Sequence, residues 1–213
     1  MTEKRRFALV GTGGRSGCFI VPIYEKYADV AEMVGFCDVS QVRMKRKLHE
    51  IKTSCPNAPD IPMYDASEFD RMIAEQKPHE VIVTTPDAIH SDYIVRALEL
   101  GCDVTTEKPM TTTAAKCQRI LDTVESTQRK ARVAFNYRWM PFNTRVKEVL
   151  DSGVIGTVQH VAMSYMLDTS HGADYFRRWH SEKAMSGGLQ IHKCTHHFDL
   201  VNWWVDGISE EVF

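Results

Sequence analysis

The sequence predicts an α/β fold in which helices cover both faces of a doubly wound parallel sheet. Two observations predict it. Short apolar runs alternate with stretches of helical periodicity through residue 136, and the first apolar run leads directly into a glycine-rich turn. Strands that alternate with helices of about 10–15 residues form βαβ units, whose parallel strands are joined by right-handed crossovers.

The elements of this sheet follow from the patterning of each segment. The expected strands are residues 7–10, 32–38, 81–85, 103–106 and 131–136, and the expected helices are 17–28, 41–52, 94–98 and 117–124. Pro86 breaks the third strand, whereas Gly101 stands where it would end a helix in the left-handed conformation. Three prolines between residues 54 and 62 predict a loop.

The regular alternation of strand and helix patterns ends after Asn136. Phe142, Val146 and Val149 have helical spacing, and this helix is expected to stop at Ser152 and Gly153. A longer strand is expected over residues 157–167, and a final helix over 188–205.

Composition and charge exclude several classes of protein. Lys and Arg number 26 against 28 Asp and Glu, so the chain lacks the basic excess of a nucleic-acid-binding domain. No stretch approaches the ~18 apolar residues of a membrane span, and the apolar run 7–10 is too short for a signal peptide. The six cysteines are scattered without close pairs, which is typical of reduced thiols. We therefore expect a cytoplasmic protein.

The turn between the first strand and the first helix predicts a dinucleotide site. Its candidate residues are Gly11, Gly13, Gly14, Arg15 and Ser16, with Ser16 in the place of the third glycine of the usual fingerprint. Such glycines let backbone amides approach a pyrophosphate at the positive end of a helix, although a tight turn also needs glycine for steric reasons alone. Asp38 closes the second strand, where an acid accepts hydrogen bonds from the adenosine ribose and repels the 2′-phosphate of NADP. NAD is therefore expected as the cofactor, with NADP less favoured, and the nearby Arg43 and Lys45 reduce that preference.

Further motifs extend along the whole chain. They are residues 85–90 (TPDAIH), 107–109 (EKP), 136–138 (NYR), 153–156 (GVIG) and a stretch rich in glycine and histidine over 187–199. With the glycine turn and Asp38, they make the sequence resemble the Gfo/Idh/MocA family, named for glucose–fructose oxidoreductase and inositol dehydrogenase. The resemblance implies a dinucleotide-binding Rossmann domain over residues 1–136. Over residues 137–213 it implies the start of a substrate-binding α/β domain with an open, mainly antiparallel sheet. Family members usually exceed 213 residues, so this second domain is expected to be incomplete.

The resemblance also implies roles for residues near the expected sheet edge. Lys108 would contact the reacting hydroxyl of the substrate, and Glu107 would contact the nicotinamide ribose. Thr85, Pro86 and His90 would line the cofactor. A cis peptide bond before Pro109 would supply the tight bend needed there.

The last helix carries two stripes of side chains. At about 100° per residue, Ile191, Cys194, Phe198, Val201 and Val205 share one stripe, and His192, His196, Asp199 and Trp203 share another. The resemblance implies that His196 is the acid/base for the substrate hydroxyl. It also implies that Asp199 is the family's carboxylate three residues after that histidine. His192 stands where the family commonly has an orienting aspartate, so the proton transfer is tuned differently or Lys193 enters the site. Restoring aspartate at position 192 is expected to be tolerated. A plain surface or interface face is the alternative.

Four functions are compatible with these residues. The first is an NAD-dependent oxidoreductase acting on a sugar, polyol or sugar derivative, for which Tyr175, Arg178 and His180 supply polar contacts. The second is a glycosidase or lyase that oxidises its substrate transiently and keeps NAD bound. The third is a metal-assisted hydrolase or lyase using His192 and His196, although no metal is expected. The fourth is a non-catalytic NAD-binding protein. For the oxidoreductase, a homo-oligomer (dimer or tetramer) is expected.

Overall fold

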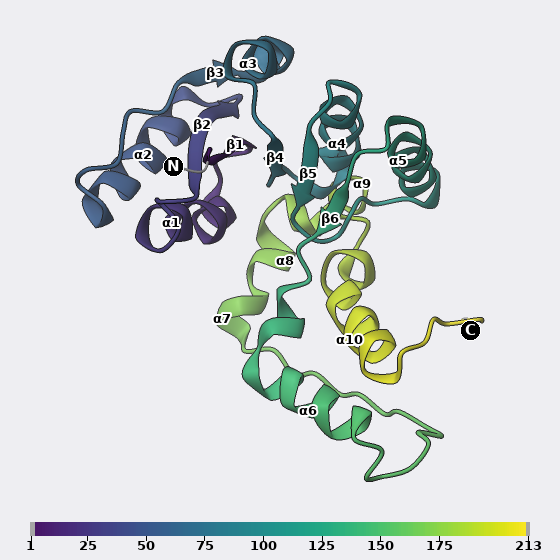
Figure 1. Ribbon diagram of the computed structural model, residues 1–213. Coiled ribbons are helices and arrows are strands. Elements are labelled where there is room, and N and C mark those ends of the chain that lie inside the picture. Colours follow the sequence, from purple (N-terminus) through teal and green to yellow (C-terminus); the bar gives the residue numbers. More distant parts are fainter. Residues whose placement is uncertain (1–2, 212–213) are drawn as a thin grey trace. The chain divides into compact units, whose positions relative to one another are not determined.

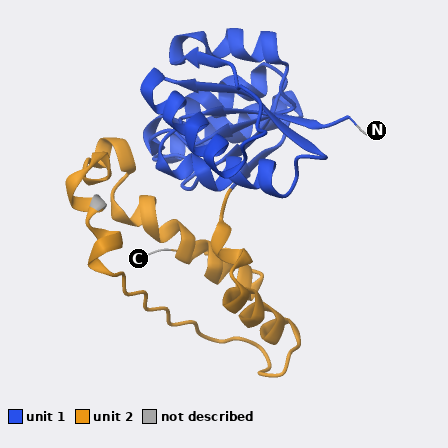
Figure 2. Ribbon diagram, turned by 90° about the vertical axis from the view of Figure 1, so that its left-hand side faces the viewer, with its two compact units in different colours: residues 1–133 blue, residues 134–213 orange. Residues whose placement is uncertain are grey.

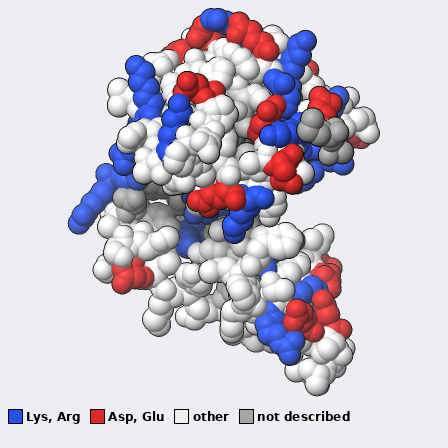
Figure 3. Space-filling model, turned by 60° about the vertical axis from the view of Figure 1, so that its left-hand side comes forward, with Lys and Arg blue, Asp and Glu red and all other residues white. Residues whose placement is uncertain are grey.

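A computed structural model describes residues 3–211, apart from the side chain of Asp174 (Figure 1). The chain divides into two compact units, residues 1–133 and residues 134–213 (Figure 2). No described helix is long and apolar enough to cross a membrane. On the face drawn in Figure 3, basic and acidic side chains are mixed, and the described residues there form no broad basic patch.

The first unit contains a six-stranded parallel sheet. Its strands, in the spatial order β3-β2-β1-β4-β5-β6, are β1 (Arg5–Val10), β2 (Ala31–Asp38), β3 (Met63–Asp65), β4 (Glu80–Val83), β5 (Asp103–Thr106) and β6 (Ala131–Val133). The winding reverses between β1 and β4, which pair in parallel. In doubly wound sheets, ligands bind at the carboxyl ends of the strands beside such a reversal. The predicted α/β fold with a parallel Rossmann sheet is confirmed.

Helices pack on both faces of this sheet (Figure 1). They are α1 (Gly17–Glu25), α2 (Gln41–Ser54), α3 (Phe69–Gln76), α4 (His90–Glu99) and α5 (Ala114–Thr127). Alternate residues of a strand point to opposite faces, so Ala8 and Val10 join a core with α3, α4 and α5, whereas Leu9 joins a core with α1 and α2. The two cores fix the strand ends that carry the glycine turn and Lys108.

The regular secondary structure described in the second unit is all helical. It contains α6 (Pro141–Asp151), α7 (Thr169–Gly172), α8 (Asp174–Arg177), α9 (Lys183–Ser186), a π-helical turn (Gln190–Cys194) and α10 (Thr195–Val205). The helices expected over residues 142–150 and 188–205 are therefore present. The second of them opens with the π-helical turn.

The expected open, mainly antiparallel sheet is not seen, and the strand expected over residues 157–167 is absent. Residues 157–168 carry no regular secondary structure and run as a long extended segment in Figure 2. Its alternating pattern of Val161, Met163 and Tyr165 suits a strand, but a strand requires a neighbour for its backbone groups. No other described segment of the second unit is a strand, so the segment has none to pair with.

Candidate active site

The glycine turn after β1 provides both a close contact and an open surface. Gly11 has a φ of +89°, and a Cβ atom there would lie 2.7 Å from backbone atoms of Thr84 and Thr85. Only glycine fits this approach to the end of β4. A Cβ atom at Gly13 or Gly14 would meet no atom within 4 Å. The turn therefore leaves its backbone open to a ligand, immediately before α1.

Asp38 is buried at the end of β2 and joined to the glycine turn. Its Oδ2 atom accepts hydrogen bonds from the backbone N–H of Thr12 at 2.6 Å and from the Thr12 hydroxyl at 2.8 Å. Its Oδ1 atom accepts from the backbone N–H of Ser40 at 2.9 Å, and Arg43 Nη1 lies 3.8 Å away. Asp38 thus holds the turn in place while carrying the charge predicted to select NAD. Sequence reasoning did not identify Thr12, because its role depends on this contact.

Glu107 and Lys108 follow the carboxyl end of β5. Arg15 Nε lies 2.5 Å from Glu107 Oε1, and the Lys108 backbone N–H donates to Glu107 Oε2 at 2.8 Å. Glu107 is buried, whereas Lys108 is half-buried. The Lys108–Pro109 bond is cis. The structure therefore brings Glu107 into contact with the glycine turn, as the common sheet edge requires.

His90 connects the end of β4 to Pro109. Its Nε2 atom lies 2.8 Å from the Thr85 carbonyl oxygen and its Nδ1 atom 2.9 Å from the Pro109 carbonyl oxygen. Both partners accept hydrogen bonds only, so a neutral imidazole donates to one and a protonated imidazole to both. His90 is almost fully buried. Rather than presenting its ring on a surface, it holds the segment containing Lys108 against β4.

Asp87 is a buried carboxyl that sequence reasoning missed as a site residue. Burial is the main cause that raises the pKa of Asp87 to about 7, and the negative charge of Glu107 adds to it. The positive charges of His90 and Lys108 act in the opposite direction. Asp87 belongs to the TPDAIH motif, which was the available signal. A buried carboxyl whose pKa is raised in this way, together with a neighbouring lysine charge, is a feature that functional sites share.

These residues fit a dinucleotide. The space above Gly13 and Gly14 admits a pyrophosphate at the start of α1. The Thr85 hydroxyl is buried at the end of β4 without a hydrogen-bond partner among the described residues. Asp38 and Glu107 provide carboxylates at the ends of two different strands. Pro86, also expected to line the cofactor, precedes the short helical turn Asp87–Ile89.

In the second unit, the polar stripe of the last helix is the buried one. His192, Lys193 and His196 are buried, with His196 only 3% exposed. The apolar stripe is more open, since Phe198 is 56% exposed, and Ile191 and Val205 are also exposed. The π-helical turn at Gln190–Cys194 departs from the 100° spacing assumed for an α-helix, and such turns are frequent at functional sites. Lys193 lies within this turn and its ammonium donates to the Tyr137 hydroxyl at 2.6 Å.

The two histidines of the predicted site have different surroundings. The ring of His196 stacks on Tyr137, with centroids 4.0 Å apart and planes within 5°. His192 is surrounded by the rings of Tyr175 at 5.5 Å, Trp179 at 5.6 Å and His180 at 4.7 Å between centroids. The structure therefore brings three predicted residues, Tyr175, His180 and His192, together. Arg178 is exposed beside them, at the start of the helical turn Trp179–Ser181.

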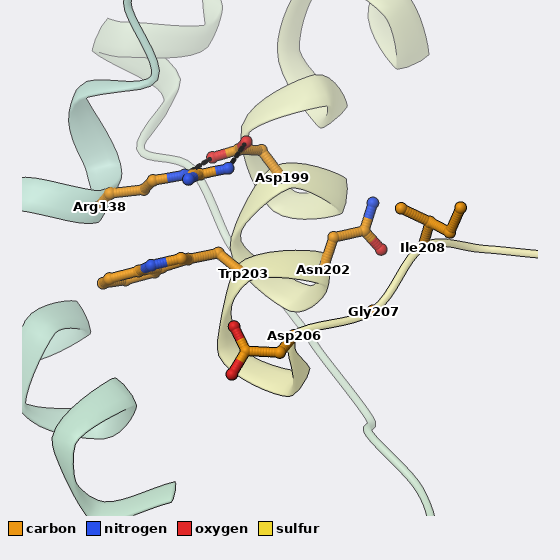
Figure 4. Close-up of a pocket in the computed structure, with 7 residues that line it drawn as sticks. All are labelled: Arg138, Asp199, Asn202, Trp203, Asp206, Gly207 and Ile208. Atoms are coloured by element: carbon orange, nitrogen blue, oxygen red, sulfur yellow. Dashed lines mark hydrogen bonds and ion pairs between the residues drawn. The ribbon is translucent and has the colours of Figure 1, made fainter. Parts of the chain in front are cut away.

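Asp199 binds Arg138 of the NYR motif. Arg138 Nε donates to Asp199 Oδ2 at 2.8 Å and Arg138 Nη2 to Oδ1 at 2.5 Å, a bidentate pair that raises the pKa of Arg138 despite its partial burial. Both residues line an open pocket of about 540 Å³ together with Trp203 (Figure 4). Among the described residues, no group of three or more His, Cys, Asp or Glu side chains is placed to hold a metal ion.

Comparison with known proteins identifies the family. The pattern described as "Oxidoreductase family, NAD-binding Rossmann fold" (GFO_IDH_MocA) matches residues 5–135. The chain belongs to this family. The pattern of the family's C-terminal alpha/beta domain matches residues 147–213. The resemblance stated from the motifs is thereby confirmed.

Three relatives show how far the similarity extends along the chain. YteT of Bacillus subtilis is 42% identical over 92% of this chain and 45% of its own length. Inositol 2-dehydrogenase of Rhizobium meliloti is 30% identical over 58% of this chain and 35% of its own. Glycosyl hydrolase family 109 protein 2 of Phocaeicola vulgatus is 26% identical over 76% of this chain and 39% of its own. The chain thus spans less than half the length of these relatives.

A solved structure supports the fold. The WlbA dehydrogenase of Bordetella pertussis, in complex with NADH and UDP-GlcNAcA, matches 95% of this chain and 55% of its own with a TM-score of 0.75. The sequence identity is 22%, so the match bears on the fold alone. The chain thus belongs to a family described as oxidoreductases with an NAD-binding Rossmann fold, and one relative is named inositol 2-dehydrogenase.

Proposed function

We propose that this protein transfers a hydride between nicotinamide and a hydroxyl group of a sugar, polyol or sugar derivative. The observation that carries the proposal is the fixed position of Lys108 at the carboxyl end of β5. Glu107 accepts from its backbone N–H, and His90 bonds to the carbonyl of the residue that follows it. A lysine held in this way suits a step in which negative charge builds on an oxygen atom.

The cofactor proposal is NAD in preference to NADP. Backbone groups of Gly13 and Gly14 would hold the pyrophosphate, Asp38 the adenosine ribose and Glu107 the nicotinamide ribose. When bound, NAD supplies the hydride acceptor. The Asp38 charge opposes a 2′-phosphate, whereas Arg43, 3.8 Å from Asp38, reduces that opposition.

The chain's own residues would handle the proton. In the oxidation direction, the Lys108 ammonium donates a hydrogen bond to the substrate oxygen, which stabilises the charge that develops there. In the second unit, His196 is the group proposed to accept a hydroxyl proton of the substrate, since imidazole exchanges protons near neutral pH in both directions. In reduction the same proton returns from His196 to the carbonyl oxygen. Tyr175, Arg178, His180 and Asp199 remain proposed substrate residues, with the two oxygens of Asp199 held by Arg138.

A relative supports a hydroxyl-rich substrate, because it is named inositol 2-dehydrogenase. Tyr175, Trp179 and His180 also present several rings close together in the second unit. Aromatic faces beside polar groups suit the apolar faces and hydroxyl edges of a sugar.

A second candidate is cleavage of a glycosidic bond with NAD kept bound. The relative named as a glycosyl hydrolase favours it, as does the histidine at position 192. In that reaction the substrate would be oxidised, the leaving group would be eliminated as an alcohol, water would add to the resulting double bond, and the carbonyl would be reduced again. NADH would then never accumulate in solution.

One experiment separates the two. The full-length protein is purified and NADH absorbance is followed as a panel of polyols, free sugars and aryl glycosides is added with NAD or NADP. Steady NADH formation from a polyol or sugar supports the first function. Release of the aryl group without NADH supports the second, and the absence of both contradicts the proposal.

The cellular setting is proposed on similar grounds. All six cysteines are free thiols, although Cys37 and Cys102 are buried, where burial raises the pKa of each thiol. Free thiols persist in a reducing compartment, which supports a cytoplasmic enzyme. A homo-oligomer is part of the same proposal, and size-exclusion chromatography with light scattering tests it.

A further inference from the structure

Lys193 is a buried lysine that the proposed mechanism does not use. It lies in the π-helical turn, is 4% exposed and donates to the Tyr137 hydroxyl at 2.6 Å. Its ammonium is also 4.9 Å from the centroid of the Tyr137 ring and 5.4 Å from that of Tyr165. The Tyr137 hydroxyl accepts from this cation, and the nearby Tyr165 ring adds the attraction of an aromatic group for a positive charge.

Tyr137 is held at its hydroxyl and contacts His196 with its ring. The Tyr137 and Tyr165 hydroxyl oxygens lie 3.3 Å apart. The hydrogen bond with Tyr137 is the main cause that raises the pKa of Tyr165, followed by burial. The Lys193 ammonium and the Tyr165 hydroxyl therefore both contact the Tyr137 oxygen. The Tyr137 ring lies parallel to the His196 imidazole at 4.0 Å, so any rotation of Tyr137 would disturb His196.

Position 192, where the family commonly has an orienting aspartate, is histidine, packed among the rings of Tyr175, Trp179 and His180. Asp199 has both oxygens bound by Arg138. The charge of Lys193 reaches this face, because it adds to burial in lowering the pKa of the neighbouring His197.

We infer that Lys193 is a positioning residue for His196 and acts through Tyr137. The inference rests on the proposed function, in which His196 is the acid/base. Lys193 fixes the Tyr137 hydroxyl, and the stacked Tyr137 ring then fixes the plane of the imidazole. A lysine one residue after position 192 thus orients the histidine by way of a phenol, in place of a direct carboxylate.

The test measures the orientation of His196 and turnover separately in the full-length protein. Ring protons of His196, assigned by their loss in His196→Asn, are shifted upfield in the NMR spectrum by the stacked Tyr137 ring. Lys193→Met removes the donor at nearly constant length, and Tyr137→Phe keeps the ring but removes the oxygen. Lys193→Arg keeps a donor. Lys147→Met is the matched control, because Lys147 is also largely buried in the second unit but pairs with Asp151 and Asp206.

In Lys193→Met we expect the upfield shift of His196 to collapse and kcat to fall about 10- to 100-fold, with KM and NAD affinity little changed. Tyr137→Phe should lower kcat in the same direction, and the double variant should be no worse than the more impaired single variant. Lys193→Arg should restore most of the shift and of kcat, and Lys147→Met should change neither.

An unchanged His196 shift in Lys193→Met overturns the inference. A lost shift with unchanged kcat also overturns it, because the contact would then be structural only. If the unmodified protein turns over no substrate of the panel, the proposed function fails instead. The NMR comparison still decides whether Lys193 orients His196.

Discussion

Arg15 Nε and Glu107 Oε1 lie 2.5 Å apart and join two segments that are 92 residues apart in the sequence. One segment is the glycine turn, and the other carries Lys108. The pair therefore places a cation beside the expected pyrophosphate and partly neutralises a carboxylate at the same edge of the sheet. Arg15 is about half exposed, so its effect on binding should be moderate.

The first prediction concerns this pair. Arg15→Ala leaves the Glu107 charge less compensated, and we expect NAD to bind about two- to fivefold more weakly, as for a half-exposed ion pair. Isothermal titration of the purified protein with NAD measures this change. Arg71→Ala, which removes an exposed arginine paired with Glu68 and Glu75 on α3, should leave NAD binding unchanged. Tighter binding in Arg15→Ala would contradict the prediction.

The second prediction concerns cofactor choice. The unmodified protein should bind NAD more tightly than NADP, and Asp38→Ala should narrow the difference because the charge that repels the 2′-phosphate is lost. The same change leaves the backbone N–H groups of Thr12 and Ser40 without their acceptor, so we expect a stability loss of about 1–3 kcal/mol. Dissociation constants for both cofactors and a denaturant titration measure the two effects.

Thr12→Val separates the effect on cofactor preference from the effect on stability. It removes only the hydroxyl that donates to Asp38, so the preference for NAD should persist while stability falls by about 1 kcal/mol. If NADP binds the unmodified protein better than NAD, Asp38 does not have the role assigned to it.

The parts of this site that could be predicted from the sequence are local. Gly11, Asp38 and Lys108 each stand at the end of a strand that the apolar pattern shows, and parallel strands bring those ends to one edge. The strand β3 was not predicted, because Met63–Asp65 is only three residues long and buries only Tyr64. The helix α3 was not identified either.

The parts that could not be predicted depend on tertiary contacts. Thr12 and Asp87 acquire their roles from a neighbouring strand end and from burial, neither of which the residue pattern states. The last helix was read at a uniform α-helical spacing, whereas Gln190–Cys194 forms a π-helical turn. The spacing of this turn places Lys193 among the buried residues. The contact between Lys193 and Tyr137 joins residues 56 positions apart.

The third prediction follows from the raised pKa of Asp87. Burial raises this pKa from 3.8 to about 7, so the folded protein retains a proton that the unfolded chain has already lost. The stabilisation from this group is complete at pH values below the pKa of Asp87 in the unfolded chain. It is lost as the pH rises through the pKa of Asp87 in the folded protein. Relative to Asp87→Asn, the free energy of unfolding of the unmodified protein should therefore fall between pH 3.8 and about 7.

Urea denaturation at several pH values in this range measures that difference. Asp70→Asn is the contrasting control, because the hydrogen bond with Arg96 lowers the pKa of the exposed Asp70. Its titration lies below this range, so the control should shift stability by a constant amount from pH 5 to pH 7. Parallel curves for Asp87→Asn and the unmodified protein would disprove the assignment.

The fourth prediction concerns Lys108. Lys108→Ala should lower kcat by about 100-fold or more, as expected when a donor to a developing negative charge is removed. NAD affinity should stay within about twofold, because the groups proposed to hold NAD are Glu107 and the glycine turn, whereas the Lys108 side chain is proposed to contact the substrate. Steady-state kinetics and a cofactor titration on the same preparation give both values. Equal losses in turnover and in NAD binding would indicate a structural role for Lys108.

The last prediction compares the two histidines of the last helix. His196→Asn removes the titrating group but keeps a polar side chain of similar reach, so activity should fall by about 10²–10⁴-fold, the range for general acid–base catalysis.

The surroundings of His192 change the expectation for His192→Asp. The family pattern suggests that aspartate is tolerated there, but the rings of Tyr175, Trp179 and His180 enclose this position. A carboxylate among them would lose hydration and the ring contacts, so we expect a stability loss of about 1–3 kcal/mol. Thermal unfolding and steady-state kinetics of both variants test this contrast. His196→Asn should lose most of its activity in the folded state, whereas His192→Asp should be less stable and keep residual activity. Activity that a chelator abolishes, together with stoichiometric metal in the purified protein, would instead favour a metal-assisted reaction at these histidines.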